Sequence, residues 1–269
     1  MDISAMHQGN RAGWNEGAAR YAEWVADDIA FLRGGGVSRH APELRLLGDL
    51  RPWCRRAIHL QCAAGKDTLS LWNLGAAEVV GVDISDAMLA LAWRKSDALG
   101  APARWYRSDV LATTHELDGS ADLVYTGKGA LNWLHDIQGW AGVVARLLAP
   151  GGRFYLFEGH PLTWIFDQDA AEPRLDPRYG DYFSERAEAD QGWPESYIGA
   201  LDRPKEQLAV KYERQWTLGA VVNALIGAGL RVECLEEHAE RYWAQFPNMP
   251  ADLVRRFPQT YSLVMWQVG

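Results

Sequence analysis

The sequence has few cysteines, and their spacing matches neither a metal site nor a disulfide framework. The 269 residues include three, Cys54, Cys62 and Cys234, and an odd number without a C-x-x-C pair argues against zinc binding and structural disulfides. No apolar run reaches the ~18 residues of a membrane-spanning helix, and the first residues do not resemble a secretory leader. From these absences we expect a cytoplasmic protein with no metal ion and no membrane partner.

Positive charge is also scarce. The chain has 27 Lys and Arg residues against 35 Asp and Glu residues, which gives a formal net charge of −8. A polyanion such as nucleic acid is therefore not an expected partner. Since 48% of the residues are hydrophobic, a chain of this length can bury one large core, and we expect a single domain that acts on a small molecule.

The stretch from Arg56 to Ser70 has the pattern of a strand, a tight turn and a helix. Small residues at such a turn let a ligand approach the backbone, and the start of the helix presents unpaired N–H groups. A second apolar strand ends at Asp83, 18 residues after Gly65. An acid at this position can accept hydrogen bonds from both ribose hydroxyls of a nucleoside.

Two kinds of nucleoside cofactor suit this geometry. A dinucleotide needs glycines under its pyrophosphate, in the pattern G-x-G-x-x-G, but these positions hold Gln61, Ala63 and Lys66. Asp67 places a negative charge where the helix dipole would hold a phosphate, whereas Lys66 favours a phosphate. S-adenosylmethionine has no phosphate, so it tolerates both the missing glycines and the acid at position 67. We therefore expect it to be the cofactor.

This part of the chain resembles the class I S-adenosylmethionine-dependent methyltransferases. It is most similar to a bacterial small-molecule subgroup whose first motif reads H-L-Q-C-x-x-G-x-D-T-L-S, found here from His59 to Ser70. The resemblance extends over residues 10–267, although His59, Gln61 and Ala63 replace an acid and two glycines of the usual motif D-x-G-x-G-x-G. It implies a Rossmann-like, doubly wound sheet of seven strands whose last strand is antiparallel.

Apolar segments along the rest of the chain alternate between strand and helix spacing, as a parallel sheet with helices on both faces requires. Residues 1–13 have no regular pattern. We expect strands at 57–60, 78–83, 103–107, 121–126, 153–158, 231–237 and 261–268. We expect helices at 14–32, 42–50, 67–74, 86–99, 138–148 and 217–228.

The single domain would comprise an N-terminal helical cap (1–50), a cofactor-binding core (51–160), an inserted lid after the fifth strand (161–215) and the C-terminal part of the core (216–269).

The resemblance implies which residues bind the nucleoside. Asp83 would bind the ribose, and Ile84 and Met88 would lie near the adenine. Asp109 would accept a hydrogen bond from the adenine amino group, and Val110 would cover the ring. The motif residues around the first turn are Gln61, Cys62, Ala63, Gly65 and Thr68.

The methionine end of the cofactor would lie between the fourth strand and the first helix. The resemblance implies that backbone carbonyls at Tyr125 and Thr126 bind the methionine ammonium. It also suggests that Trp14 and Tyr21 fold over this end, where an aromatic face stabilises a sulfonium by about 1 kcal/mol. The alternative for both aromatic residues is packing of an amphipathic helix on the core.

Residues 161–212 are rich in aromatic side chains and show no strong period. We interpret this segment as a lid over the acceptor, since a long irregular stretch inside a domain is commonly functional. A structural insert or a dimer contact is the alternative, so a homodimer stays open. The predicted acceptor contacts are Trp133, Trp164, Tyr179 and Tyr197.

His160 and Glu158 follow the fifth strand and are the candidate catalytic residues. Methylation of an amine or a hydroxyl releases a proton, and a histidine titrates in the range needed to take it. The alternative is that His160 packs under the lid while Glu158 pairs with a basic residue. Methyl transfer itself depends chiefly on holding the acceptor in line with the methyl group.

We therefore expect transfer of a methyl group from S-adenosylmethionine to a nitrogen or oxygen of a small molecule, with S-adenosylhomocysteine as product. Three alternatives remain. One is a dinucleotide-dependent oxidoreductase. The second is an S-adenosylmethionine-binding enzyme that catalyses another reaction, such as a cyclisation. The third is a non-catalytic binding protein on the same fold.

Overall fold

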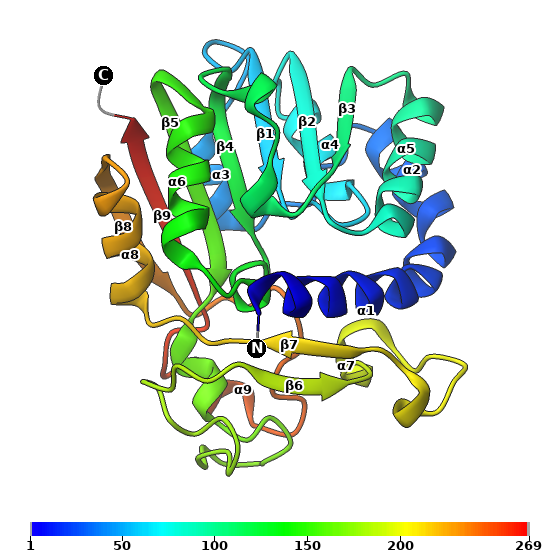
Figure 1. The fold of residues 1–269 in the computed structure, drawn as a ribbon, viewed down its shortest axis with the longest axis vertical. Helices are drawn as coiled ribbons and strands as arrows, with labels where there is room; N and C mark the ends of the chain where they lie inside the picture. The colour runs from blue at the N-terminus through cyan, green and yellow to red at the C-terminus, as the bar shows by residue number, and fades with distance from the viewer. Residues whose placement is uncertain (1, 268–269) are drawn as a thin grey trace.

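A seven-stranded sheet forms the centre of the computed structural model, which describes residues 2–267 (Figure 1). The strand order is β3-β2-β1-β4-β5-β9-β8. The neighbours from β3 to β5 pair in parallel, whereas β9 runs antiparallel to β5 and β8. The predicted Rossmann-like α/β fold with an antiparallel last strand is confirmed. The strands are β1 (Arg56–Leu60), β2 (Glu78–Asp83), β3 (Ala103–Arg107), β4 (Ala121–Gly127), β5 (Leu148–Gly159), β8 (Leu230–His238) and β9 (Thr260–Gln267).

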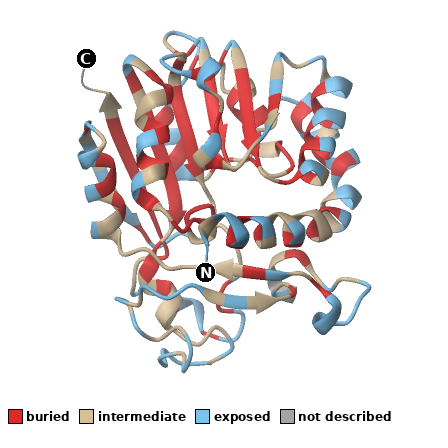
Figure 2. Ribbon diagram, viewed as in Figure 1, coloured by how far each residue is buried: buried red, intermediate tan, exposed pale blue. Residues whose placement is uncertain are grey.

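Helices cover both faces of the sheet, so its central strands are buried (Figure 2). Such two-sided burial explains why the parallel strands read as continuous apolar runs. Trp140 and Leu225 lie in the core of one face, and Leu47 and Leu69 lie in the core of the other. On the first face are α6 (Ile137–Leu147) and α8 (Leu218–Gly227); on the second are α2 (Val25–Arg33), α3 (Ala41–Leu47), α4 (Lys66–Asn73) and α5 (Asp86–Leu99).

Local caps set the ends of two helices. The Ser85 hydroxyl accepts a hydrogen bond from the backbone N–H of Met88 at the start of α5, and Gly100 ends that helix in a left-handed conformation. Asp136 caps α6 by accepting from the N–H of Gly139. These caps satisfy backbone groups that a helix end leaves unpaired.

The N-terminal helix is longer than the sequence predicts. Helix α1 (Ile3–Glu23) includes most of the segment that was expected to be irregular, and Trp24 separates it from α2. Gly9 and Gly13 weaken the helical pattern of the sequence, but both are needed here. A Cβ atom on Gly9 would lie 2.7 Å from the carbonyl oxygen of Val210. The close packing of α1 on β7 therefore overrides local propensity.

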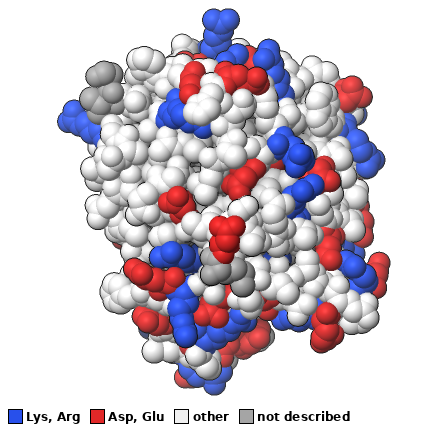
Figure 3. All heavy atoms as spheres, in the orientation of Figure 1, with Lys and Arg blue, Asp and Glu red and all other residues white. Residues whose placement is uncertain are grey.

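The segment after β5 is ordered around a small antiparallel sheet of β6 (Glu188–Gln191) and β7 (Val210–Glu213), with the short α7 (Glu195–Ile198) between them. Figure 1 shows α1 lying between this two-stranded sheet and the carboxyl ends of the parallel strands of the main sheet. The short α9 (Ala251–Val254) lies before β9. On the face drawn in Figure 3, acidic and basic side chains are intermixed around this lower end of the molecule. In the described chain, no helix is long and apolar enough to cross a membrane.

Candidate active site

The turn after β1 has an unusual backbone. Gln61, Ala63 and Gly65 have positive φ angles of 56°, 45° and 76°, a region that only glycine adopts without strain. A Cβ atom on Gly65 would lie 2.6 Å from the ring of Trp105, so a side chain does not fit there. The backbone N–H of Ala63 donates to Asp83 over 2.8 Å, which ties the turn to the end of β2.

A first cavity of about 540 Å³ lies at the carboxyl ends of the parallel strands, under α1. This is the edge where open α/β sheets bind ligands. Most of the predicted cofactor residues line it, namely Trp14, Tyr21, Gln61, Cys62, Ala63, Gly65, Asp83, Ile84, Asp109 and Val110.

Asp83 is held in place by two backbone donors. Its carboxylate oxygens accept hydrogen bonds from the N–H groups of Ser85 and Ala63, each over 2.8 Å. Burial raises the pKa of Asp83 to about 6, although these donors oppose the effect. Each carboxylate oxygen has a second lone pair, so the group can still accept from a ribose hydroxyl.

Asp109 is paired with a histidine of α1. The distance between Nδ1 of His7 and the carboxylate of Asp109 is 2.7 Å, and the other carboxylate oxygen accepts from the N–H of Leu111. Nε2 of His7 is buried and has no hydrogen-bond partner among residues 2–267. Because His7 also lines the first cavity, the predicted adenine acceptor is a His–Asp pair rather than a lone acid.

Glu158 holds the loop that follows β4. Its carboxylate accepts hydrogen bonds from the backbone N–H groups of Gly129, Ala130 and Leu131, and from its neighbour Gly159. Burial raises the pKa of Glu158, and the four amides oppose this effect. The contacts of this side chain therefore shape the wall of the cavity, and it lines neither the first cavity nor the second one described below.

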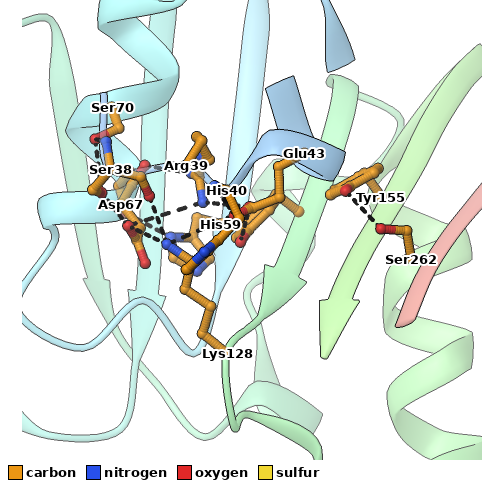
Figure 4. Close-up of polar contacts among 12 residues, drawn as sticks. Ser38, Arg39, His40, Glu43, His59, Asp67, Ser70, Lys128, Tyr155 and Ser262 are labelled. Atoms are coloured by element: carbon orange, nitrogen blue, oxygen red, sulfur yellow. Dashed lines mark hydrogen bonds and ion pairs between the residues drawn. The ribbon is translucent and has the colours of Figure 1, made fainter. Parts of the chain in front are cut away.

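A network of polar side chains lies at the start of α4 (Figure 4). Asp67 accepts from Nζ of Lys128 over 2.9 Å and from the hydroxyl of Ser38, and a guanidinium nitrogen of Arg39 lies 4.0 Å away. Lys128 and Arg39 lower the pKa of Asp67 against the effect of its burial. Lys128 and Arg39 offset the charge of Asp67, so this charge is a weaker argument against a phosphate than the sequence alone indicates.

His59 occupies the position where the usual motif has an acid. Its Nδ1 lies 2.8 Å from the hydroxyl of Thr68, and burial lowers its pKa to about 3. The ring meets Tyr125 edge to face, at a centroid distance of 4.8 Å. A neutral histidine thus fills this position without adding charge beneath the turn.

A second cavity of about 260 Å³ adjoins the first. Trp133, Tyr197, Tyr242 and Gly129 line both cavities. All four predicted acceptor contacts, Trp133, Trp164, Tyr179 and Tyr197, line the second one. The chain after β5 thus supplies part of the wall of this cavity.

Four predicted cofactor residues line neither cavity. Thr68, Met88, Tyr125 and Thr126 are fully buried. The hydroxyl of Tyr125 donates to Glu43, and the other three also pack inside the protein. Their side chains pack inside the protein and do not face either cavity. The backbone role predicted for Tyr125 and Thr126 stays a prediction.

His160 also lies outside both cavities. Its Nδ1 accepts from the N–H of Leu162, and its Nε2 lies 2.8 Å from the carboxylate of Glu237. The ring meets Tyr261 edge to face. This location does not favour the predicted role as base, because the side chain contacts Glu237 of β8 and Tyr261 of β9 and not a cavity.

Several residues of the cavities were not identified from the sequence. His7 and Asn10 belong to the segment expected to be irregular, and Tyr242 follows β8 in a stretch without periodic spacing. Lys128 had a usable signal, since it lies between two glycines at the carboxyl end of β4. Within residues 2–267, no three His, Cys, Asp or Glu side chains are grouped in a way that could hold a metal ion.

Comparison with known proteins gives a family match for part of the chain and a shared fold for most of it. Residues 57–152 match the family model for a methyltransferase domain. The fold is shared with an S-adenosylmethionine-dependent methyltransferase from Mesorhizobium loti (23% identity, 84% of this chain and 96% of that chain, TM-score 0.58). A Listeria monocytogenes protein assigned to the same class aligns at 17% identity over 86% of this chain and 100% of that chain, with a TM-score of 0.60.

Residues 57–152 therefore match a methyltransferase domain, and the described chain shares its fold with these two proteins. A demethylmenaquinone methyltransferase from Thermus thermophilus is 37% identical over 126 residues. That match covers 42% of this chain and 56% of the Thermus protein, so the chain spans about half the length of this curated relative.

Proposed function

We propose that the whole chain transfers the methyl group of S-adenosylmethionine to a nitrogen or oxygen of a small molecule and releases S-adenosylhomocysteine. The observation that carries this proposal is the pair of adjoining cavities. The first has the predicted nucleoside contacts, and the second is bounded by the segment after β5.

Two buried polar atoms support a nucleoside in the first cavity. Nε2 of His7 and Oε1 of Gln61 lack hydrogen-bond partners among residues 2–267, and both residues line this cavity. Buried polar groups are rarely left unpaired, because desolvation without a hydrogen bond costs about 1–3 kcal/mol. A ligand with donors and acceptors near both atoms, as the adenosyl group has, would remove that cost.

In this proposal the chain contributes binding and orientation. Asp83 accepts from the ribose, and Asp109 with His7 contacts the adenine. When bound, S-adenosylmethionine supplies an electrophilic methyl group on a sulfonium. Where the two cavities join, Trp133, Tyr197 and Tyr242 exclude water and offer aromatic faces to positive charge.

The experiment that tests the proposal combines cofactor binding with product detection. Calorimetry should show micromolar binding of S-adenosylhomocysteine and no comparable binding of NAD. The protein would then be incubated with labelled S-adenosylmethionine and a pool of metabolites, with demethylmenaquinone added because the Thermus relative is named for it. Label in an acceptor supports methyl transfer. Conversion of the cofactor itself, or a rearranged metabolite, with no label in an acceptor supports the cyclisation alternative. Binding without turnover supports the non-catalytic one.

A further inference from the structure

The second cavity has more acidic than basic side chains in its wall. Of the described residues that line it, one is basic: Lys211. Its ammonium donates to the backbone carbonyl of Gly192 and lies 4.8 Å from the ring centre of Trp193, so its charge is already engaged. The acids in the wall are Asp167, Asp169, Asp176, Asp190 and Glu213.

Some of these acids already have partners within the protein. Asp167 pairs with Arg174, and Asp190 lies 3.2 Å from Nζ of Lys205. The carboxylate of Asp176 accepts from two backbone N–H groups. These contacts engage the carboxylates, but they do not place a cation inside the cavity.

Glu213 has no such partner. No hydrogen bond or ion pair from the described side chains, which do not include those of residues 195 and 196, reaches its carboxylate. Glu213 lines the cavity at the end of β7. Its cross-strand neighbour in β6 is a second acid, Glu188. Burial raises the pKa of Glu213 to about 7, with Lys211 opposing the shift and Asp190 adding to it. A carboxylate in this setting is stabilised by a cationic ligand beside it.

Aromatic rings form much of the remaining wall. Trp193 packs against Trp133 at a centroid distance of 5.6 Å and stacks on Tyr197 at 6.3 Å. Tyr197 in turn meets Trp243 at 5.5 Å. Aromatic faces attract cations, and carboxylates do so more strongly. Such a wall suits an ammonium ion and repels a phosphate or a carboxylate.

On the basis of the proposed function, we propose that the acceptor carries a primary or secondary amine, bound in the second cavity as its ammonium ion beside Glu213. The Glu213 carboxylate takes one proton from the ammonium, which frees the nitrogen lone pair. The nitrogen then bonds to the methyl carbon while the sulfur–methyl bond breaks, and its electron pair stays on sulfur. The products are neutral S-adenosylhomocysteine and a methylated ammonium ion, and the proton on Glu213 passes to solvent.

The test uses the full chain saturated with S-adenosylhomocysteine and three probes of similar size: 2-phenylethylamine, 2-phenylethanol and 3-phenylpropionate. Calorimetry at pH 8 measures each dissociation constant. We expect the amine to bind at least tenfold more tightly than the alcohol, and the carboxylate to bind most weakly. Glu213→Gln should reduce the preference for the amine to less than threefold, whereas Glu206→Gln, which removes an exposed acid of the same segment, should leave it unchanged.

Binding of S-adenosylhomocysteine is measured first and serves as the fold control for both variants. Absence of that binding in the unsubstituted protein would contradict the proposed function. Normal cofactor binding, combined with equal or absent binding of the amine, would overturn the present inference alone. An amine preference that survives Glu213→Gln would also overturn it.

Discussion

At the scale of single residues, the site depends on carboxylates whose surroundings give them different tasks. Asp83 is buried, and its oxygens keep lone pairs for a ligand. The Glu158 carboxylate is instead used by four backbone amides. Asp67 is neutralised by Lys128 and Arg39. Residue type and position alone do not separate these three roles, because each follows from contacts made by distant parts of the chain.

Removing the Asp83 carboxylate should weaken cofactor binding without unfolding the protein. We expect Asp83→Ala to raise the dissociation constant of S-adenosylhomocysteine by about 30-fold, which corresponds to about 2 kcal/mol for the loss of charged hydrogen bonds. Calorimetry measures the affinity, and circular dichroism checks the fold. Asp97→Asn is the matched control, since it removes an exposed acid from α5. Unchanged affinity in folded Asp83→Ala would place the ribose elsewhere.

The pH dependence of cofactor binding should report the same group. Burial raises the pKa of Asp83 to about 6, so the side chain accepts two ribose hydrogen bonds above that pH and becomes protonated below it. Affinity for S-adenosylhomocysteine should therefore be constant above about pH 7 and fall below pH 6, by at most about tenfold per pH unit. Calorimetry from pH 5 to 8 measures this, and a flat profile would show that Asp83 does not contact the ligand.

His160 offers a direct test of its two roles. A general base would make His160→Ala lose about 10² to 10⁴ in turnover at unchanged cofactor affinity. Because its ring lies against Glu237 and Tyr261, outside both cavities, we expect turnover to stay within about threefold. Single-turnover kinetics with an identified acceptor measures the difference, and the larger loss would restore the base role.

At the scale of elements, the sequence predicts the main sheet well and the N-terminal helix poorly. Strands such as β2 (Glu78–Asp83) are apolar between their two end residues because both faces of the sheet are covered. Their pattern can therefore be recognised from the local sequence. Helix α1 buries small and polar residues, including His7 and Asn10, and its apolar face cannot be recognised from spacing. The β6–β7 sheet was missed because alternation of apolar and polar residues is weak in such short strands.

The glycines of α1 give a stability test of that packing. Gly9→Ala should destabilise the protein by about 1–3 kcal/mol, since the added methyl meets the backbone carbonyl of Val210 at 2.7 Å. The gain of about 1 kcal/mol in helix propensity does not offset this clash. Gly142→Ala in α6 is the control, because a Cβ there meets no atom within 4 Å, and it should be stabilising. Urea denaturation measures both, and stabilisation by Gly9→Ala would contradict the packing of α1 on β7.

At the scale of the whole molecule, the segment after β5 is attached mainly through α1 and the loop that follows β4 (Figure 1). Without ligand, we expect backbone amides in residues 161–212 to exchange faster than those of β1 and β4, since the segment has little regular structure of its own. Addition of S-adenosylhomocysteine with an acceptor amine should slow this exchange. Hydrogen exchange read by mass spectrometry measures the change. Equally slow exchange with and without ligand would identify a rigid insert.

The contact between α1 and the wall of the second cavity has a consequence for the order of events in turnover. Trp14 lines the first cavity, and its ring lies 4.6 Å from that of Trp193 in the wall of the second. A cofactor that fixes Trp14 thereby fixes the surface against which an acceptor rests. Substrates should then enter in a compulsory sequence, cofactor before acceptor, and S-adenosylhomocysteine should leave last. In steady-state kinetics, S-adenosylhomocysteine would then be a competitive inhibitor toward S-adenosylmethionine and a non-competitive inhibitor toward the acceptor.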